Sequence, residues 1–153
     1  MAFVSRADQF AELEPAQLAQ WRNFGTWPDH TFFPKVVGLV LDELRVDYAR
    51  MSLPYRPELN QPHGIVHGGA IATLIDSVVV PAIGAVYAQD VIYSTIDMQI
   101  RYMSAVREQD VVAEGIVTKR GRSIVFCDAE VYLPDGTIAA QGTLTYKVSP
   151  PRS

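Results

Sequence analysis

The feature that most constrains this chain is one long apolar segment, residues 70–88, whose length almost suffices to span a bilayer. The segment nevertheless contains Asp76, Ser77 and Pro81, and no basic residues anchor its ends. An aspartate near the centre of a membrane-spanning helix costs roughly 2.5–3.5 kcal/mol. We therefore predict a helix that is buried on most faces within a soluble protein, and no membrane partner.

The segments on either side of this helix have the pattern of β-strands, because apolar and polar residues alternate along them. A run of strands with one helix set to one side predicts an α+β domain with an antiparallel sheet. Since the helix is apolar on nearly every face, we expect the sheet to curve around it. The expected strands cover residues 38–44, 49–55, 95–102, 111–119, 125–132 and 138–148.

The first part of the chain, residues 1–31, is predicted to be an N-terminal extension that precedes the main domain at residues 32–150. Pro15 is a favourable first residue for a helix, and Leu18, Trp21 and Phe24 then fall on one helical face. We expect this helix to pack against the main domain, but the pattern assigns it no role.

Composition excludes several classes of partner and site. The formal net charge is -4 and the sequence pI is about 5.3, which argues against nucleic acid as the main partner. Cys127 is the only cysteine, so neither an internal disulfide nor a cysteine-pair zinc site is expected. No metal or cofactor is predicted. The first residues lack the apolar stretch of a signal peptide, so we expect a cytoplasmic protein.

A glycine-rich loop, residues 61–69, leads into the predicted helix. Gly68 and Gly69 let the backbone approach a ligand closely. The first N–H groups of a helix have no partner within the helix, and the helix dipole is positive there. Such a helix start is suited to stabilise a carbonyl oxygen that becomes an oxyanion. A glycine-rich turn without any chemistry explains the same pattern equally well.

Asp76 is the second unusual feature, because it lies inside the most apolar stretch of the chain. A buried carboxylate is costly unless it has a partner or a functional task. One interpretation is a structural aspartate that caps a neighbouring loop. We favour a functional role because the glycine-rich helix start lies nearby in the sequence.

The spacing of Gly68 and Asp76 predicts a dimer if both residues are catalytic. They are eight residues apart, which corresponds to about 12 Å along a helix. A catalytic base must lie roughly 3 Å, or one water, from its target. One helix therefore cannot supply both groups to one substrate, whereas two antiparallel copies can. We predict a two-fold dimer with two shared sites; further pairing of dimers into tetramers is left open.

The segment NQPHGIVHGGAIATLIDS, residues 60–77, resembles the signature of hot-dog-fold thioesterases of the PaaI-like and 4-hydroxybenzoyl-CoA type. The likeness continues through residues 94–103, 121–123 and 140–143, and covers roughly residues 32–148. It implies the hot-dog fold, in which an antiparallel β-sheet is wrapped around a long central α-helix. It also implies an acyl-CoA substrate and no metal or cofactor.

The resemblance further implies residue roles. The N–H of Gly68 would polarise the thioester carbonyl, and Gln61 would lie beside the reacting group. Asp76 from the partner subunit would activate water or attack directly. Ser94 matches a hydroxyl that helps to position water in some members, and His67 would fix the loop.

Other residues of the signature are candidates for substrate binding. Asn60 is adjacent to Gln61, so either amide could face the site. The basic turn after the fourth predicted strand often meets the coenzyme A nucleotide in the family, although a solvated basic turn is an equally good interpretation. The full set of binding candidates is Asn60, His67, Gly69, Arg120, Gly121, Arg122 and Ser123.

The predicted function is hydrolysis of a fatty or aryl acyl-CoA thioester to a free acid and coenzyme A. The alternative is a non-catalytic protein that binds or senses acyl-CoA; Asp76 argues against it, because a binder needs no buried carboxylate. A hot-dog dehydratase is a third possibility, but its usual pairing of a catalytic histidine with an acid is not found. Candidates for the acyl pocket are Tyr55, Ile65, Val79, Ile83 and Tyr93.

Overall fold

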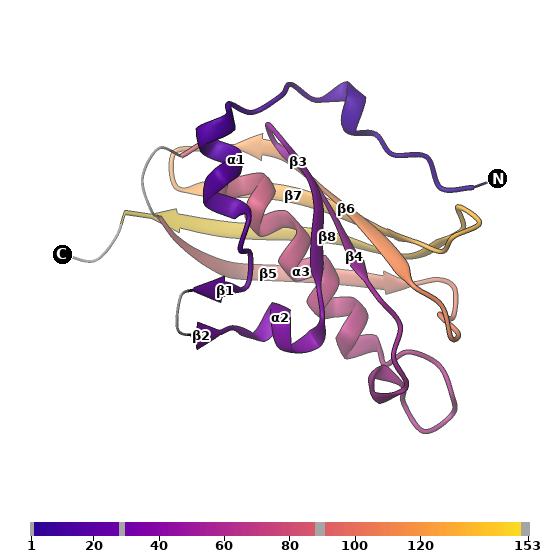
Figure 1. Ribbon diagram of the computed structural model, residues 1–153. Coiled ribbons are helices and arrows are strands. Elements are labelled where there is room, and N and C mark those ends of the chain that lie inside the picture. The colour runs from indigo at the N-terminus through magenta and orange to yellow at the C-terminus, as the bar shows by residue number, and fades with distance from the viewer. Residues whose placement is uncertain (1, 28–29, 88–90, 151–153) are drawn as a thin grey trace.

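One antiparallel six-stranded sheet is folded around a central helix in the computed structural model, which describes residues 2–27, 30–87 and 91–150 (Figure 1). The predicted strands are confirmed, with bounds that move by a few residues. In their order across the sheet the strands are β3 (Val40–Arg45), β4 (Tyr48–Leu53), β6 (Val111–Arg120), β7 (Ile124–Tyr132), β8 (Ile138–Ser149) and β5 (Ile92–Tyr102).

The central helix, α3 (Gly68–Gly84), confirms the predicted buried helix but begins two residues earlier and ends earlier. Ala88, the last residue of the predicted helix, lies outside the described residues. Pro81 lies within α3 without ending it, because the helix continues to Gly84 and the Ala85 N–H donates to the Pro81 carbonyl over 3.0 Å. Among the described residues, no helix is long and apolar enough to cross a membrane.

Two glycines on the concave side of the sheet allow the strands to approach α3 closely. A Cβ atom at Gly142 of β8 would lie 2.6 Å from Cγ2 of Ile75. A Cβ atom at Gly115 of β6 would lie 3.0 Å from Cγ1 of Val78. Larger residues at either position would push the sheet away from the helix, so the tight helix–sheet core depends on both glycines.

The N-terminal part of the chain lies against both sides of this sheet and helix. Its elements are a 3-10 turn η1 (Ala7–Gln9), α1 (Pro15–Trp21), the strands β1 (Thr26–Trp27) and β2 (His30–Thr31), and α2 (Phe33–Val37). A second 3-10 turn, η2 (Pro57–Leu59), lies later in the chain, between β4 and α3. The predicted helix at Pro15 is confirmed, although Phe24 lies beyond its end. Figure 1 shows α1, β1, β2 and α2 beside α3, where the edges β3 and β5 leave the sheet open.

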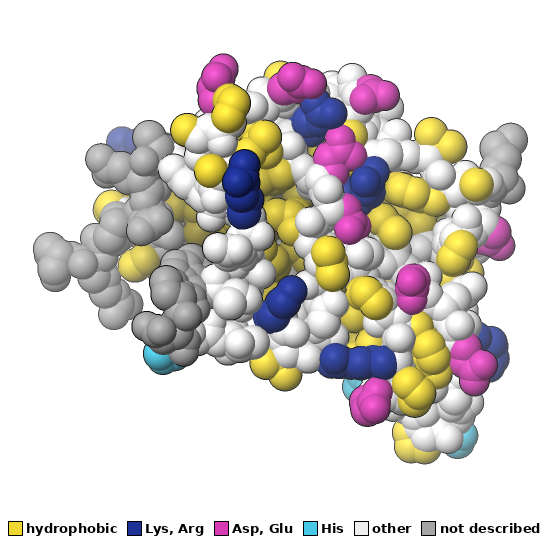
Figure 2. Space-filling model, viewed as in Figure 1, with side chains coloured by type: hydrophobic (Ala, Val, Ile, Leu, Met, Phe, Trp, Pro, Cys, Tyr) yellow, Lys and Arg dark blue, Asp and Glu magenta, His cyan; other side chains and the backbone are white. Residues whose placement is uncertain are grey.

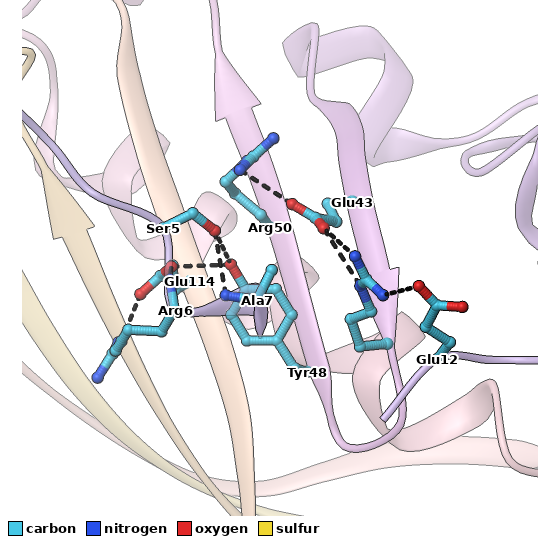
Figure 3. A network of polar contacts seen from close by, with 9 residues as sticks. Ser5, Arg6, Ala7, Glu12, Glu43, Tyr48, Arg50 and Glu114 are labelled. Atoms are coloured by element: carbon cyan, nitrogen blue, oxygen red, sulfur yellow. Dashed lines mark hydrogen bonds and ion pairs between the residues drawn. The ribbon is translucent and has the colours of Figure 1, made fainter. Parts of the chain in front are cut away.

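A buried carboxylate anchors the beginning of the chain to the outer face of the sheet (Figure 3). Glu114 of β6 is fully buried. One of its oxygens accepts hydrogen bonds from the Arg6 backbone N–H at 2.7 Å and from the Tyr48 hydroxyl at 2.8 Å. The Arg6 guanidinium forms an ion pair with the other oxygen at 2.5 Å. Without these partners the buried charge would be strongly unfavourable.

The edge strand β3 carries ion pairs that make it unsuitable for pairing with another strand. Glu43 binds Arg45 at 3.1 Å and Arg50 at 3.0 Å, and Arg45 also binds Glu12 of the N-terminal segment at 2.9 Å. Figure 2 shows acidic and basic side chains interspersed over this face of the molecule. Each exposed pair contributes little stability, but charges on a short edge strand discourage edge-to-edge association.

We predict that Glu114→Ala lowers the free energy of unfolding by about 2–4 kcal/mol, because the Arg6 backbone N–H and the Tyr48 hydroxyl lose their buried acceptor, while Arg6 keeps its ion pair with Glu130 at 2.9 Å. Urea unfolding followed by circular dichroism measures the loss. The matched control is Glu58→Ala at an exposed position, for which a change within about 0.5 kcal/mol is expected. Equal effects of the two substitutions would show that the Glu114 network does not anchor the N-terminal segment.

Candidate active site

The sheet leaves one face of α3 uncovered, and Asp76 lies on this face. Gly69, Thr73, Asp76 and Val80 recur at intervals of three or four residues and remain partly or fully exposed, whereas Ile75 is fully buried. This spacing places the four residues along one side of a helix. We call them the open stripe. The most polar residue of an otherwise apolar helix therefore faces the gap between the two sheet edges.

The carboxylate of Asp76 is held by two hydroxyl groups from neighbouring strands. Thr95 of β5 donates to Oδ1 at 3.0 Å, and Tyr146 of β8 donates to the same oxygen at 2.5 Å. Burial raises the pKa of Tyr146, and its hydrogen bond to Asp76 raises this pKa further, so the phenol stays protonated and remains a donor. Because both donors bind Oδ1, these hydrogen bonds orient the carboxylate and leave Oδ2 for other contacts.

A cavity of about 480 Å³ adjoins Asp76, and three parts of the chain form its wall. The helix α3 contributes Ala72, Thr73, Asp76, Ser77 and Val80, and the strands β5 and β8 contribute Tyr93, Thr95, Met98 and Tyr146. The N-terminal part contributes Trp21, Phe24, Gly25, Phe32, Phe33 and Pro34. The cavity is therefore mostly apolar, with its polar groups gathered around one carboxylate, as is common in ligand sites.

Of the predicted acyl-pocket residues, only Tyr93 lines this cavity. Val79 and Ile83 are fully buried in the core, and Ile65 lines a different cavity at the start of α3. The Tyr55 hydroxyl accepts a hydrogen bond from the Asn60 amide at 3.0 Å. The sequence pattern could not identify the wall because the N-terminal part reaches it only through the path of the folded chain.

The start of α3 has the geometry of an anion-stabilising site. The N-cap residue His67 accepts a hydrogen bond at Nδ1 from the Gly69 N–H over 2.8 Å, which fits the predicted role of fixing the loop. The Gly68 carbonyl accepts from the Tyr102 hydroxyl at 3.0 Å. Within the described part of the chain, the Gly68 N–H has no hydrogen-bond partner. This N–H therefore remains available at the positive end of the helix dipole.

Gly68 and Asp76 do not line the same cavity. Gly68 lies beside a second cavity of about 310 Å³, whose wall includes Ile65 and Tyr102, whereas Asp76 lies beside the cavity of about 480 Å³. Their separation along α3 agrees with the spacing expected from the sequence. One chain thus presents the N–H group at the start of α3 and the carboxylate of Asp76 beside two separate cavities.

The two amides before the helix have different surroundings. The Asn60 amide nitrogen donates to Tyr55, and its Oδ1 is buried without a hydrogen-bond partner among the described residues. The Gln61 side chain is partly exposed, and its Oε1 accepts from the His63 N–H at 2.8 Å. Asn60 is therefore committed to the interior, and Gln61 is the amide that can face a ligand.

The hydroxyl predicted at Ser94 does not reach Asp76 of its own chain. Successive side chains of a strand point to opposite faces, and Thr95 makes the contact to Asp76. Ser94 is exposed on the other face of β5. Thr95 therefore makes the contact to Asp76 within one chain, and the role of Ser94 in positioning water stays a prediction. Strict alternation would set Thr95 on the face opposite Met98, but an irregularity in the strand register between Thr95 and Asp97 brings both side chains to the same cavity.

Arg120 has a structural role that the sequence did not indicate. Its guanidinium binds Asp47 at 2.5 Å, the Ile83 carbonyl at 3.0 Å and the Tyr87 hydroxyl at 3.2 Å. Burial lowers the pKa of Arg120, but the hydrogen bonds to Asp47 and Tyr87 outweigh it and raise this pKa. A cation that binds the last carbonyls of a helix stabilises its negative end. Arg120 therefore holds the end of α3 within the chain, and its predicted contact with a nucleotide stays a prediction.

The other residues of the basic turn remain exposed. The Gly121 N–H donates to the Ile124 carbonyl at 2.8 Å, and the Ser123 carbonyl accepts from the Val148 N–H at 2.8 Å. Arg122 lies between them with its side chain in solvent. These backbone contacts fix the turn, so Arg122 and Ser123 remain the binding candidates of this region.

Comparisons with known proteins agree with this architecture. The family model for the thioesterase superfamily matches residues 63–140, just over half of the chain. A protein of Halobacterium salinarum whose name assigns it provisionally to the esterases is 28% identical over 112 residues, which span 70% of this chain and 74% of that protein.

Solved structures share the same fold. A conserved protein from Pseudomonas aeruginosa is 29% identical, with a TM-score of 0.71, and the match covers 75% of this chain and 91% of that one. The PaaI protein of the E. coli phenylacetic acid degradation operon is 16% identical, with a TM-score of 0.69, and the match covers 74% and 81%. These likenesses confirm the predicted hot-dog fold.

Proposed function

Because the chain belongs to the thioesterase superfamily, we propose that it hydrolyses a fatty or aryl acyl-CoA thioester to a free acid and coenzyme A. The observation that carries this proposal is the position of Asp76. Its carboxylate is oriented by Thr95 and Tyr146 at the wall of an apolar cavity. An oriented acid beside an apolar pocket suits a reaction in which water or the carboxylate attacks an acyl carbon.

The second half of the site comes from a partner subunit in this proposal. The edge strand β5 is 11 residues long, and unlike β3 it carries no ion pairs within the described chain, so its open edge is suited to pair with a second copy. Along β5, Thr95 contacts Asp76 while Tyr102 contacts Gly68. An antiparallel pair of β5 strands reverses this order across the two-fold axis, so the Asp76 end of one chain meets the Gly68 end of the other.

The reaction then uses one group from each helix. The N–H of the partner's Gly68 binds the thioester carbonyl oxygen and stabilises the negative charge that develops on it. Asp76 either removes a proton from water or attacks the acyl carbon directly, in which case water releases the acid in a second step. In the first route the carbon–sulfur bond breaks and the coenzyme A thiolate takes up the proton that Asp76 removed from water. In the second route the thiolate leaves as a mixed anhydride forms on Asp76, and water that hydrolyses this anhydride supplies the proton for the thiolate. The partner's Gln61 lies beside the reacting carbonyl.

In this proposal the basic turn binds the coenzyme A nucleotide. Arg120 binds the carboxyl-terminal end of α3 through the Ile83 carbonyl, so Arg122 lies near that end as well. In an antiparallel dimer the partner's loop before Gly68 extends toward the same end of α3. Arginine suits phosphate because its planar guanidinium can donate two hydrogen bonds at once. Arg122 therefore supplies local positive charge in a chain whose net charge is -4.

We predict that Asp76→Asn reduces kcat at least about 10³-fold, since the amide retains the shape of the side chain but cannot act as a base or nucleophile. Release of free thiol from a panel of acyl-CoA thioesters measures the effect. Asp128→Asn, at an exposed site on β7, is the matched control and should keep wild-type activity. Unchanged turnover in Asp76→Asn would exclude Asp76 from catalysis. Binding of acyl-CoA without any thiol release by the wild type would favour the non-catalytic alternative.

Substitutions at Gly68 test the oxyanion donor directly. Proline is well tolerated as the first residue of a helix, and the preceding His67 has φ -61° and ψ 135°, a conformation that a following proline allows. Gly68→Pro should therefore fold but lose the N–H, which lowers kcat about 10²–10³-fold. Gly68→Ala keeps the N–H, and its Cβ would meet the Tyr102 ring at an ordinary 3.4 Å. Equal activities of the two variants would rule out this N–H as the donor.

A further inference from the structure

We infer that the N-terminal extension is a specificity element that selects a fatty acyl group larger than a single aromatic ring. This inference rests on the proposed hydrolysis at Asp76 and names the substrate class of the same site. Trp21 and Phe24 of the extension, with Phe32, Phe33 and Pro34 of the adjoining segment, form the wall of the cavity that faces α3. Without them the open stripe would lie uncovered from Asp76 toward the end of the helix.

The wall is held against α3 by a close contact that only glycine allows. A Cβ atom at Gly84 would lie 2.3 Å from the Trp21 indole and 2.4 Å from the Tyr93 hydroxyl oxygen. The ring centroids of Trp21 and Tyr93 are 6.4 Å apart, and those of Trp21 and Phe24 are 6.2 Å apart. The indole thus lies directly on the last turn of α3. This contact fixes the end of α1, so this side of the cavity is formed before any ligand binds.

The segment that begins at Phe32 is fixed to the end of this wall as well. The Phe32 N–H donates to the Gly25 carbonyl at 2.8 Å, across the small sheet of β1 and β2. Gly25 has φ 77°, a conformation that favours glycine. A Cβ atom at this position would also lie 3.2 Å from Lys35. These contacts bring two groups of aromatic rings that are separated in the sequence to one cavity: Trp21 with Phe24, and Phe32 with Phe33.

The chemistry of the wall indicates the acyl group that it accepts. The extension and its adjoining segment present mainly aromatic rings and a proline, whereas the carboxyl and hydroxyl groups of the cavity lie on α3 and the strands. An acyl group whose carbonyl lies at Asp76 would contact mainly the carbon atoms of this wall. An unsubstituted hydrocarbon chain suits this wall.

The cavity of a single chain is larger than the smallest acyl groups need. Its volume is about 480 Å³, whereas an apolar cavity of about 150 Å³ suffices to bind benzene. An acetyl or benzoyl group would leave most of the apolar wall in contact with water. A medium-chain fatty acyl group would cover it, including Phe32 and Phe33 at the rim, which are 45% and 64% exposed.

The test compares kcat/KM for acetyl-, benzoyl-, octanoyl-, lauroyl- and palmitoyl-CoA in the wild type and four variants. Wild-type kcat/KM should rise about 100-fold from acetyl- to lauroyl-CoA, since each added methylene gains apolar contact. Val80→Phe fills the cavity from the helix side and should lower the lauroyl-to-acetyl ratio at least about tenfold. Trp21→Ala opens the wall and should raise the palmitoyl-to-octanoyl ratio about tenfold.

Two further variants separate specificity from folding. Leu18→Ala changes a 38% exposed residue of the same helix α1, away from the cavity, and should leave every ratio within about twofold of the wild type. Phe33→Ala changes a side chain that is already mostly exposed, so it should fold even if Trp21→Ala does not. It should lower the lauroyl-to-acetyl ratio about threefold or more through lost contact at the rim.

Binding of lauric acid, measured by calorimetry, distinguishes failure of this inference from failure of the proposed function. If no acyl-CoA is hydrolysed but laurate binds the wild type and binds Val80→Phe at least about tenfold more weakly, the proposed function fails while the pocket assignment stands. If hydrolysis occurs but its acyl profile is unchanged in Val80→Phe and Phe33→Ala, the pocket assignment is overturned. A wild-type preference for acetyl- or benzoyl-CoA over lauroyl-CoA would overturn it too.

Discussion

An apolar helix enclosed by a single open sheet is buried on every face except the one between the two sheet edges. This packing determines where chemistry is possible in the present fold, because only the open stripe of α3 can hold a polar side chain without full desolvation. Asp76 occupies this stripe, and the hydroxyls of Thr95 and Tyr146 orient it. The same gap admits the N-terminal extension on one side and, in the proposed dimer, a second copy of the chain on the other.

The proposed division of the site between two subunits follows from the length of the helix. The donor at the start of α3 and the acid in its middle are too far apart to act on one carbonyl, and the structure places them beside different cavities. A dimer solves this problem without new residues, since each helix contributes one group to each of two sites. The long open edge of β5 and the ion-paired edge of β3 favour β5 as the pairing edge of the proposed dimer.

Much of the fold was predictable from the sequence because local patterns encode it. Strand alternation gave the sheet, and an apolar run with one aspartate gave the central helix. Contacts between distant segments were not predictable in this way. Arg120 was predicted to meet a nucleotide, and no local pattern indicated that it also binds Asp47 and the Ile83 carbonyl. The choice between Ser94 and Thr95 depends on which face of β5 meets the helix, and the role of Trp21 depends on the path of the extension to Gly84.

The central claim, that each site combines Asp76 of one subunit with the partner's Gly68, is tested most directly by complementation. Asp76→Asn and Gly68→Pro subunits are unfolded together, refolded as an equal mixture and assayed for thioester hydrolysis. A mixed dimer has one site with both defects and one site with neither. Since half of the dimers are mixed, the account predicts recovery of about a quarter of wild-type activity from two nearly inactive parents. A mixture no more active than the parents, although mixed dimers form, would contradict the shared site.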